Sequence, residues 1–250
     1  MKKIKFLKKT FKNNSGRNNT GKITVRSRGG SKIKKSYRSI DFFRSIWFQK
    51  AKIVKIEYDP FRNAPIALIN CLNLQIFFYV IKTENINLNS TIETYPTAKV
   101  FVGNSLIIKN IPTGVNLNNI EIYEKQGSQF ARSGGAFCQI IKKSKFYSII
   151  KLKSSKLKKI SNKCFATIGK VSINLFVNKN LYHGAGRNRL KGWRPKVRGL
   201  AMNPIDHPHG GGKGKKSGKA ISMSPWGKLI KGKKTRRKYN EIKVKGYIYK

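Results

Sequence analysis

The distribution of charge along this 250-residue chain is its most restrictive feature. Seven of the nine acidic residues lie between positions 41 and 124, whereas residues 1–40 contain none and only Asp206 and Glu241 follow. Against them stand 55 Lys and Arg residues, which give a net charge of +46. Repulsion among so many cations opposes compaction unless a polyanion neutralises them. We therefore expect an ordinary folded middle, polycationic ends and a nucleic acid as partner.

The middle of the chain has the pattern of short β-strands. Apolar and charged residues alternate over 54–58, and two apolar runs at 66–72 and 75–81 are typical of a hairpin of buried strands. Further apolar stretches follow at about ten-residue spacing, each bounded by Gly, Asn, Ser or Lys. This spacing predicts an all-β chain with two small barrels and a seam at 103–114. One helix is expected, over 171–182.

Both ends of the chain are rich in Lys, Arg and Gly, and their apolar residues stand alone. Isolated apolar side chains cannot close a core, so one interpretation is a solvated charge run or linker. The other is a segment shaped by folded RNA, in which cations meet phosphates, glycines allow close approach and an indole stacks on a base. The irregular spacing of the glycines and aromatic residues favours RNA, both at 16–30 and around Trp226 with the basic run that follows it.

Several features narrow the class of protein. Cys71, Cys138 and Cys164 lie far apart without zinc-ligand spacing, so we expect core thiols in a reducing compartment and no metal site. No apolar run approaches the ~20 residues of a membrane span, and the basic N-terminus lacks the apolar region of a secretory signal. Abundant Lys, Asn, Ile and Phe with scarce Ala are typical of AT-rich coding DNA. This bias favours a mitochondrion, with a plastid or the cytoplasm of a bacterium as alternatives.

The segment Asp206-His207-Pro208-His209, followed by three glycines, admits three interpretations. Two imidazoles and a carboxylate could ligate a metal, although no fourth ligand is near in sequence. A histidine could act as a general base with a serine, although a carboxylate adjacent in sequence is poorly placed to orient it. The third interpretation, which we favour, is a loop that contacts RNA, where imidazoles donate to phosphate or 2′-OH and the glycines allow close contact. The glycines do not form a P-loop, because the pattern and the following helix are both missing.

A specific resemblance rests on co-linear sequence blocks. The longest is AMNPIDHPHGGG at 201–212, followed by SPWG at 224–227 and KGKKTR at 231–236. Shorter blocks precede it at 15–24, 37–42, 56–60, 110–114, 129–135, 166–169 and 194–199. Together they resemble the uL2 family of universal large-subunit ribosomal proteins.

The resemblance implies a fold and a domain order. It implies an OB-fold barrel followed by an SH3-like barrel, with long basic N- and C-terminal extensions. The corresponding boundaries are a basic extension at 1–15, an OB-fold RNA-binding domain at 16–100, an SH3-like barrel at 104–183 and a Gly-rich extension threading rRNA at 184–250. Residues 82–99 match the family poorly, so the resemblance says least about the far side of the first barrel.

The resemblance also implies a function. Such a chain is a structural constituent of the large ribosomal subunit that binds rRNA and supports subunit association and the peptidyl-transferase region. Its partners would be large-subunit rRNA, neighbouring ribosomal proteins and the small subunit across the interface. No cofactor is expected beyond the Mg²⁺ and K⁺ of the surrounding rRNA, and no enzyme activity, because RNA catalyses peptidyl transfer. Two alternatives stay open: a ribosome-dependent contribution of the His207 loop to catalysis, and a general nucleic-acid-compacting protein.

The residues expected to contact rRNA are basic, aromatic or part of the histidine loop. They are Arg17, Asn18, Arg26, Arg28, Arg132, Trp193, Arg194, Lys196, Arg198, Asn203, His207, His209, Gly210, Gly211, Gly212, Lys213, Lys215, Trp226, Lys231, Lys233, Lys234 and Arg236. For the two tryptophans, packing against a barrel is an equally open role. Lys213 stands where the family usually has an acid after the glycine triplet, so any role of that carboxylate is absent.

Overall fold

The described residues fall into two compact units. The computed structural model describes residues 6–10, 13–30, 36–44, 48–71, 74, 76–173, 184–212 and 221–232. The first unit, which we call the β unit, comprises the described residues among 6–10 and 36–173. The second, which we call the terminal unit, comprises 13–30, 184–212 and 221–232. The terminal unit therefore combines segments from both ends of the chain.

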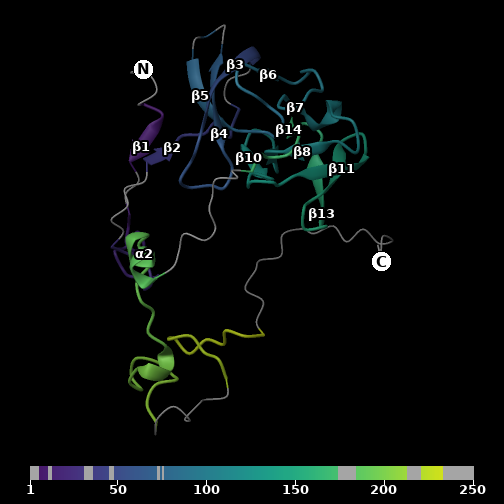
Figure 1. The fold of residues 1–250 in the computed structure, drawn as a ribbon. Helices are drawn as coiled ribbons and strands as arrows, with labels where there is room; N and C mark the ends of the chain where they lie inside the picture. The colour runs from purple at the N-terminus through teal and green to yellow at the C-terminus, as the bar shows by residue number, and fades with distance from the viewer. Residues whose placement is uncertain are drawn as a thin grey trace. The chain divides into compact units, whose positions relative to one another are not determined.

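The β unit contains the described strands, which are short and mostly antiparallel (Figure 1). They are β1 (Lys8–Thr10), β2 (Ser36–Arg38), β3 (Phe48–Glu57), β4 (Ile66–Cys71), β5 (Ile76–Ile81), β6 (Thr91–Thr94), β7 (Ser105–Ile107), β8 (Asn116–Asn118), β9 (Ile120–Glu121), β10 (Ser128–Phe130), β11 (Cys138–Lys143), β12 (Tyr147–Lys151), β13 (Leu157–Ser161) and β14 (Phe165–Ile168). A 3₁₀ turn, η1 (Ile108–Asn110), follows β7. The all-β prediction is confirmed.

Ten of these strands form one hydrogen-bonded series, in the order β13-β12-β11-β8-β14-β7-β6-β3-β4-β5. The predicted hairpin is confirmed: β4 and β5 are antiparallel, with Ile66 opposite Ile81 and Cys71 opposite Ile76. The first half of the unit, β3 to β6, joins the second half, β7 to β14, through one parallel pairing of Thr94 with Ser105. Each half is thus built from sequential strands, as the ten-residue spacing predicts.

A β-bulge in β3 changes which of its side chains face the core. The register against β4 shifts between Ile53 and Lys55. Ala51 and Ile53 are buried on one side of the shift, whereas Val54 is 47% exposed. The alternation over 54–58 correctly predicts a strand, but Val54 and Tyr58 lie outside because the extra residue of a bulge reverses the pleat locally.

Each half of the β unit has its own apolar core. Two clusters lie in the first half, one ending at Ile92 and the other also including Val171, whereas the cluster of the second half begins at Ala98. The expected seam at 103–114 is not a linker, because Leu106, Ile108 and Ile111 within it are fully buried in the second core. Because these apolar side chains pack in one cluster, residues 103–114 are part of the second half.

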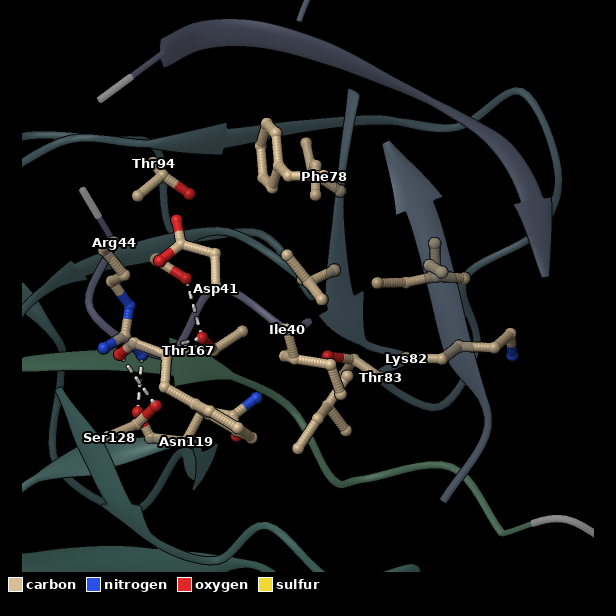
Figure 2. A pocket seen from close by; sticks show the side chains of 18 of the residues that line it. Ile40, Asp41, Arg44, Phe78, Lys82, Thr83, Thr94, Asn119, Ser128 and Thr167 are labelled. Atoms are coloured by element: carbon tan, nitrogen blue, oxygen red, sulfur yellow. Dashed lines mark hydrogen bonds between the residues drawn. The ribbon is translucent and has the colours of Figure 1, made fainter. Parts of the chain in front are cut away.

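A small pocket lined by both apolar and polar side chains lies where the two halves meet (Figure 2). Arg44, just before β3, enters it nearly fully buried and donates to the backbone oxygen of Asn119 and to the hydroxyl of Thr167, the latter at 3.2 Å. Its Nη1 is 3.5 Å from Oε1 of Glu121 in β9. Burial lowers the pKa of the Arg44 guanidinium to about 10, although Glu121 and Asp41 favour its charged form. The ion pair therefore joins the two halves at a site that water barely reaches.

The expected helix at 171–182 is wrong at its start. Val171 is buried and extended, and it bridges antiparallel to Thr83. Residues 174–182 lie outside the described part of the chain. The described α-helix, α2 (Ala185–Leu190), has six residues and belongs to the terminal unit. A buried β-branched residue next to a strand partner favours the extended conformation over the helical one.

Candidate nucleic-acid interface

The terminal unit is strongly cationic and has no apolar core. Its described segments 13–30, 184–212 and 221–232 contain four, six and two Lys or Arg residues and a single acid, Asp206. No apolar side chain among these residues is buried. The prediction that isolated apolar residues here cannot close a core is therefore confirmed for the described residues. Local hydrogen bonds and a contact of Arg28 with Trp193 hold the unit together.

The loop that begins at Asn14 is organised by backbone and amide hydrogen bonds. Asn18 accepts, at its side-chain Oδ1, hydrogen bonds from the backbone N–H of Thr20 and Lys22 and from the Thr20 hydroxyl, at 2.8–3.1 Å. The backbone N–H of Asn18 donates to the Lys22 oxygen at 2.9 Å. The side-chain oxygen of Asn18 thus stabilises a turn. That turn presents Arg17 and Lys22 with exposed side chains.

Two segments from opposite ends of the chain pair in the terminal unit. The N–H of Gly29 donates to the Gly192 oxygen at 2.9 Å, and the N–H of Arg194 donates to the Ser27 oxygen at 3.0 Å. Arg28 and Trp193 form an antiparallel bridge, and the guanidinium carbon of Arg28 lies 3.6 Å from the centroid of the Trp193 ring. A cation over an indole is favourable, so this contact fastens the two segments together.

The histidine loop folds back on itself and encloses His207, whose side chain is only 8% exposed. The N–H of His209 donates to Nδ1 of His207 at 3.0 Å, so Nδ1 carries no proton in this arrangement. The two rings lie 4.8 Å apart between centroids. Nε2 of His209 is 2.9 Å from the Ile221 oxygen and 3.2 Å from the N–H of Met223, which connects the loop to the segment 221–232.

The glycines of this loop have a structural role of their own. A β-carbon at Gly210 would fall well inside contact distance of the backbone oxygen of Asn203, and one at Gly211 would collide with the Pro204 ring. Gly211 also has φ +72°, in the left-handed region. The backbone oxygen of Asn203 accepts from the N–H of His207 at 3.3 Å, which closes the turn. The glycines therefore allow the loop to pack on itself, and their contact with RNA stays a prediction.

The remaining predicted contacts of the terminal unit divide into two groups. Within the described segments the exposed ones are Arg26, Arg194, Lys196, Arg198, Trp226 and Lys231. Trp226, 71% exposed, sits in a turn in which the N–H of Gly227 donates to the Ser224 oxygen at 3.0 Å. Gly212 has φ +95°. Lys213, Lys215, Lys233, Lys234 and Arg236 lie outside the described residues.

The β unit offers a second basic and aromatic surface, around the predicted residue Arg132. The guanidinium of Arg132 lies 4.7 Å from the ring centroid of Phe42, and that of Arg62 lies 5.6 Å from it. Tyr37 and Phe61, which line the same hollow, meet edge to face at 5.8 Å. Cations next to aromatic rings are suited to phosphate and base together. Arg62 forms a 2.6 Å ion pair with the buried carboxylate of Asp59, so its charge is already balanced and Arg132 is the cation of this hollow that is open to a ligand.

No group of three or more potential metal ligands exists in the described part of the chain. The three cysteines are buried and free, as expected. Burial raises the pKa of Cys138 to about 11 and that of Cys164 to about 12, so both stay protonated thiols at neutral pH. Their chemistry is therefore that of core residues rather than of nucleophiles or metal ligands.

Comparisons with known proteins agree with the sequence blocks. A family model described as "Ribosomal Proteins L2, RNA binding N-terminal domain" matches residues 4–94. A second, "Ribosomal Proteins L2, C-terminal domain", matches residues 101–227. The chain is similar to the large ribosomal subunit protein uL2 of Hyphomonas neptunium, with 43% identity over 235 residues that cover 94% of this chain and 84% of the relative.

Two further relatives show the same relation. The large ribosomal subunit protein uL2 of Methylacidiphilum infernorum is 46% identical over 93% of this chain and 82% of its own length. That of Wigglesworthia glossinidia brevipalpis is 44% identical over 92% of this chain and 82% of its own length. The chain belongs to the uL2 family.

Membership of the uL2 family agrees with the architecture described above. One family model ends at residue 94 and the other begins at residue 101. In the same region, the apolar cluster of the first half ends at Ile92 and that of the second half begins at Ala98. The OB-fold half followed by the SH3-like half, expected from the resemblance, fits this order of an RNA-binding domain and a C-terminal domain. The part of the chain that the structure describes contains no helix with the length and apolar composition of a membrane span.

Proposed function

We propose that this uL2-family chain is a structural constituent of the large ribosomal subunit, binds its rRNA and is not an enzyme. The observation that carries the proposal is the terminal unit, whose described residues combine twelve cations with one acid and no apolar core. Such a unit repels itself in isolation and is stabilised when phosphates neutralise it. A polyanion that also fills the spaces between the loops, as folded rRNA does, satisfies both needs.

The binding mechanism is the release of counterions from the RNA. Each phosphate that Lys or Arg neutralises frees condensed cations, and the observed affinity then falls with salt. The exposed arginines of the terminal unit and Arg132 in the hollow of the β unit supply these contacts. Neighbouring ribosomal proteins, the small subunit and the peptidyl-transferase region are the further partners that the family resemblance implies. The ions involved are the Mg²⁺ and K⁺ of the rRNA itself.

The burial of His207 argues against a direct contribution of its side chain to peptidyl transfer. A general base needs an accessible nitrogen within hydrogen-bond reach of the proton that it removes. His207 is buried, and its Nδ1 already accepts from the backbone of His209. In our proposal the loop acts by holding RNA in place, which changes a rate through position without proton transfer.

We propose that the compartment of this ribosomal subunit is a mitochondrion. The AT-rich coding bias supports a mitochondrial large ribosomal subunit, while the relatives described above come from bacteria. Hybridisation of the gene to separated organelle and chromosomal DNA tests this point. A signal from the main chromosome of a bacterium would refute the mitochondrial location and leave the ribosomal role intact.

The function itself is tested by competition and salt titration. We expect the full chain to prefer a transcript of large-subunit rRNA over random-sequence DNA of the same length. The logarithm of its affinity should fall with the logarithm of salt, by about 0.9 for each duplex phosphate neutralised and about 0.7 for each single-stranded one. Equal affinity for both nucleic acids would favour a general compacting protein instead. An affinity that hardly changes with salt would refute the electrostatic mechanism.

A further inference from the structure

One hollow in the terminal unit is lined by arginines from both ends of the chain. Arg17, Arg26 and Arg28 come from the segment 13–30, and Arg194 comes from the segment that pairs with it. The sequence separates the two segments by more than 150 residues. The hollow therefore exists only when both segments are in place.

The pairing fixes the position of Arg194 in this hollow. Its N–H is bound to the Ser27 oxygen at 3.0 Å, so its backbone is part of the bridge. A β-carbon at Gly29 would lie 3.5 Å from Cδ of Arg194, which places the arginine stem against that glycine. Trp193 is held on one face by the Arg28 guanidinium, 3.6 Å from the ring centroid. Trp193 is therefore a positioning residue that holds Arg28 at the rim.

The electrostatics of the hollow call for an anion. No acidic residue lines it, and none of the four arginines has an ion-pair partner among the described residues. Like charges that converge on one space repel each other, and an anion between them removes that repulsion. Guanidinium groups bind phosphate oxygens in a fork geometry, with two parallel N–H donors. The backbone phosphate of RNA fits this set of donors better than a base does.

We propose that this hollow is a composite phosphate site, at which the N- and C-terminal segments hold the same stretch of rRNA backbone. The inference rests on the proposed function and deepens it. Neither segment makes the site alone, so the Arg26 and Arg194 contributions are coupled through a shared ligand. Independent tails, by contrast, would contribute independently.

A double-mutant cycle on the full chain tests the coupling. The variants are Arg26→Ala, Arg194→Ala and their combination, titrated with a transcript of large-subunit rRNA. Residues that share a ligand are non-additive, so the loss of affinity in the double variant should differ from the product of the single losses by at least about threefold. Arg198→Ala is the matched control, because Arg198 is an exposed cation that does not line the hollow. Its combination with Arg26→Ala should match the product within about twofold.

A second measurement reports on the pairing itself. In a chain that carries Trp47→Phe and Trp226→Phe, Trp193 is the remaining tryptophan. We expect its fluorescence to change when the rRNA transcript binds, and Arg28→Met to abolish most of that change. Arg194→Lys should retain rRNA binding better than Arg194→Ala, because it keeps the charge while losing the fork.

The outcomes separate this inference from the proposed function. If the Arg26 and Arg194 losses multiply as the control pair does, the composite site is refuted, while specific rRNA binding by the unchanged chain still supports the function. If inorganic phosphate alone reproduces the Trp193 response at the same charge concentration, the hollow is a free-anion site and the rRNA assignment is refuted. If the unchanged chain shows no preference for rRNA, the proposed function itself fails.

Discussion

Removing the charge of Arg44 should destabilise the β unit far more than removing an exposed lysine. Arg44 and Glu121 have side chains only 8% and 2% exposed, so neither charge is solvated when its partner is lost. Burial lowers the pKa of the Arg44 guanidinium to about 10 even though Glu121 favours its charged form, so each charge of this pair depends on the other in place of water. Breaking a buried pair leaves an uncompensated charge and costs about 3–5 kcal/mol.

The perturbation is therefore Arg44→Met, with Glu121→Leu as the second change. In the Arg44→Met variant the Glu121 carboxylate keeps the hydrogen bond that the backbone N–H of Phe165 donates to it at 3.0 Å, but it loses its cation. This loss should lower the free energy of unfolding by about 3–5 kcal/mol. The double variant replaces the pair by apolar side chains of similar size, and it should cost far less than the sum of the single changes.

Urea unfolding of the full chain, followed by far-UV circular dichroism, measures these differences. Lys170→Met is the matched control, because Lys170 and Glu84 form a 3.4 Å pair with side chains 35% and 45% exposed. An exposed pair of this kind contributes about 0.2–1 kcal/mol. If Arg44→Met costs no more than Lys170→Met, the reasoning from desolvation is refuted. The same holds if the double variant loses the full sum of its parts.

Three further predictions test other parts of the molecule. Gly210→Ala should lower the free energy of unfolding by about 1–3 kcal/mol, because its β-carbon would overpack the histidine loop. Gly186→Ala should leave stability unchanged or raise it, because this glycine lies inside α2 with no neighbour near its β-carbon. Imidazole NMR signals and thermal melts distinguish the two variants. Burial raises the pKa of Cys164 to about 12, so this thiol should resist iodoacetamide at pH 8 until urea exposes it. In the unfolded chain the thiol ionises above about pH 9, whereas in the folded chain it stays protonated. The free energy of unfolding should therefore fall as the pH rises from 9 towards 12. Arg132→Ala should weaken rRNA binding and lower, by about 1, the slope of the logarithm of affinity against the logarithm of salt concentration. Lys163→Ala, at an exposed lysine, should change neither quantity. Equal slopes for both variants would show that the hollow of the β unit does not contact rRNA.

The strands of the β unit follow from the sequence because their pattern is local. The hairpin of β4 and β5 is visible in two apolar runs around a polar turn, and the structure pairs Ile66 with Ile81 accordingly. The bulge at Val54 is not visible, because it depends on how the backbone of β3 meets β4 rather than on side-chain type. The same reason explains the seam, since burial of Ile108 depends on partners distant in sequence.

The candidate interface could be predicted in composition but not in arrangement. Charge counts and glycine spacing locate the cationic ends, yet nothing local indicates that Arg28 stacks on Trp193. The burial of His207 was also missed, because it follows from the way Gly199 and Gly210 let the loop close, and a glycine pattern alone does not distinguish internal packing from contact with RNA.

The terminal unit can form only after both of its paired segments, 13–30 and 184–212, have been synthesised. A growing polypeptide releases residues 13–30 long before Trp193 has been made, so this arm emerges without its companion. At about 5–20 residues per second, the wait lasts roughly 8 to 33 seconds. During that interval the nascent arm is a polycation without its folding partner, and exposed cations of this kind attract any polyanion nearby.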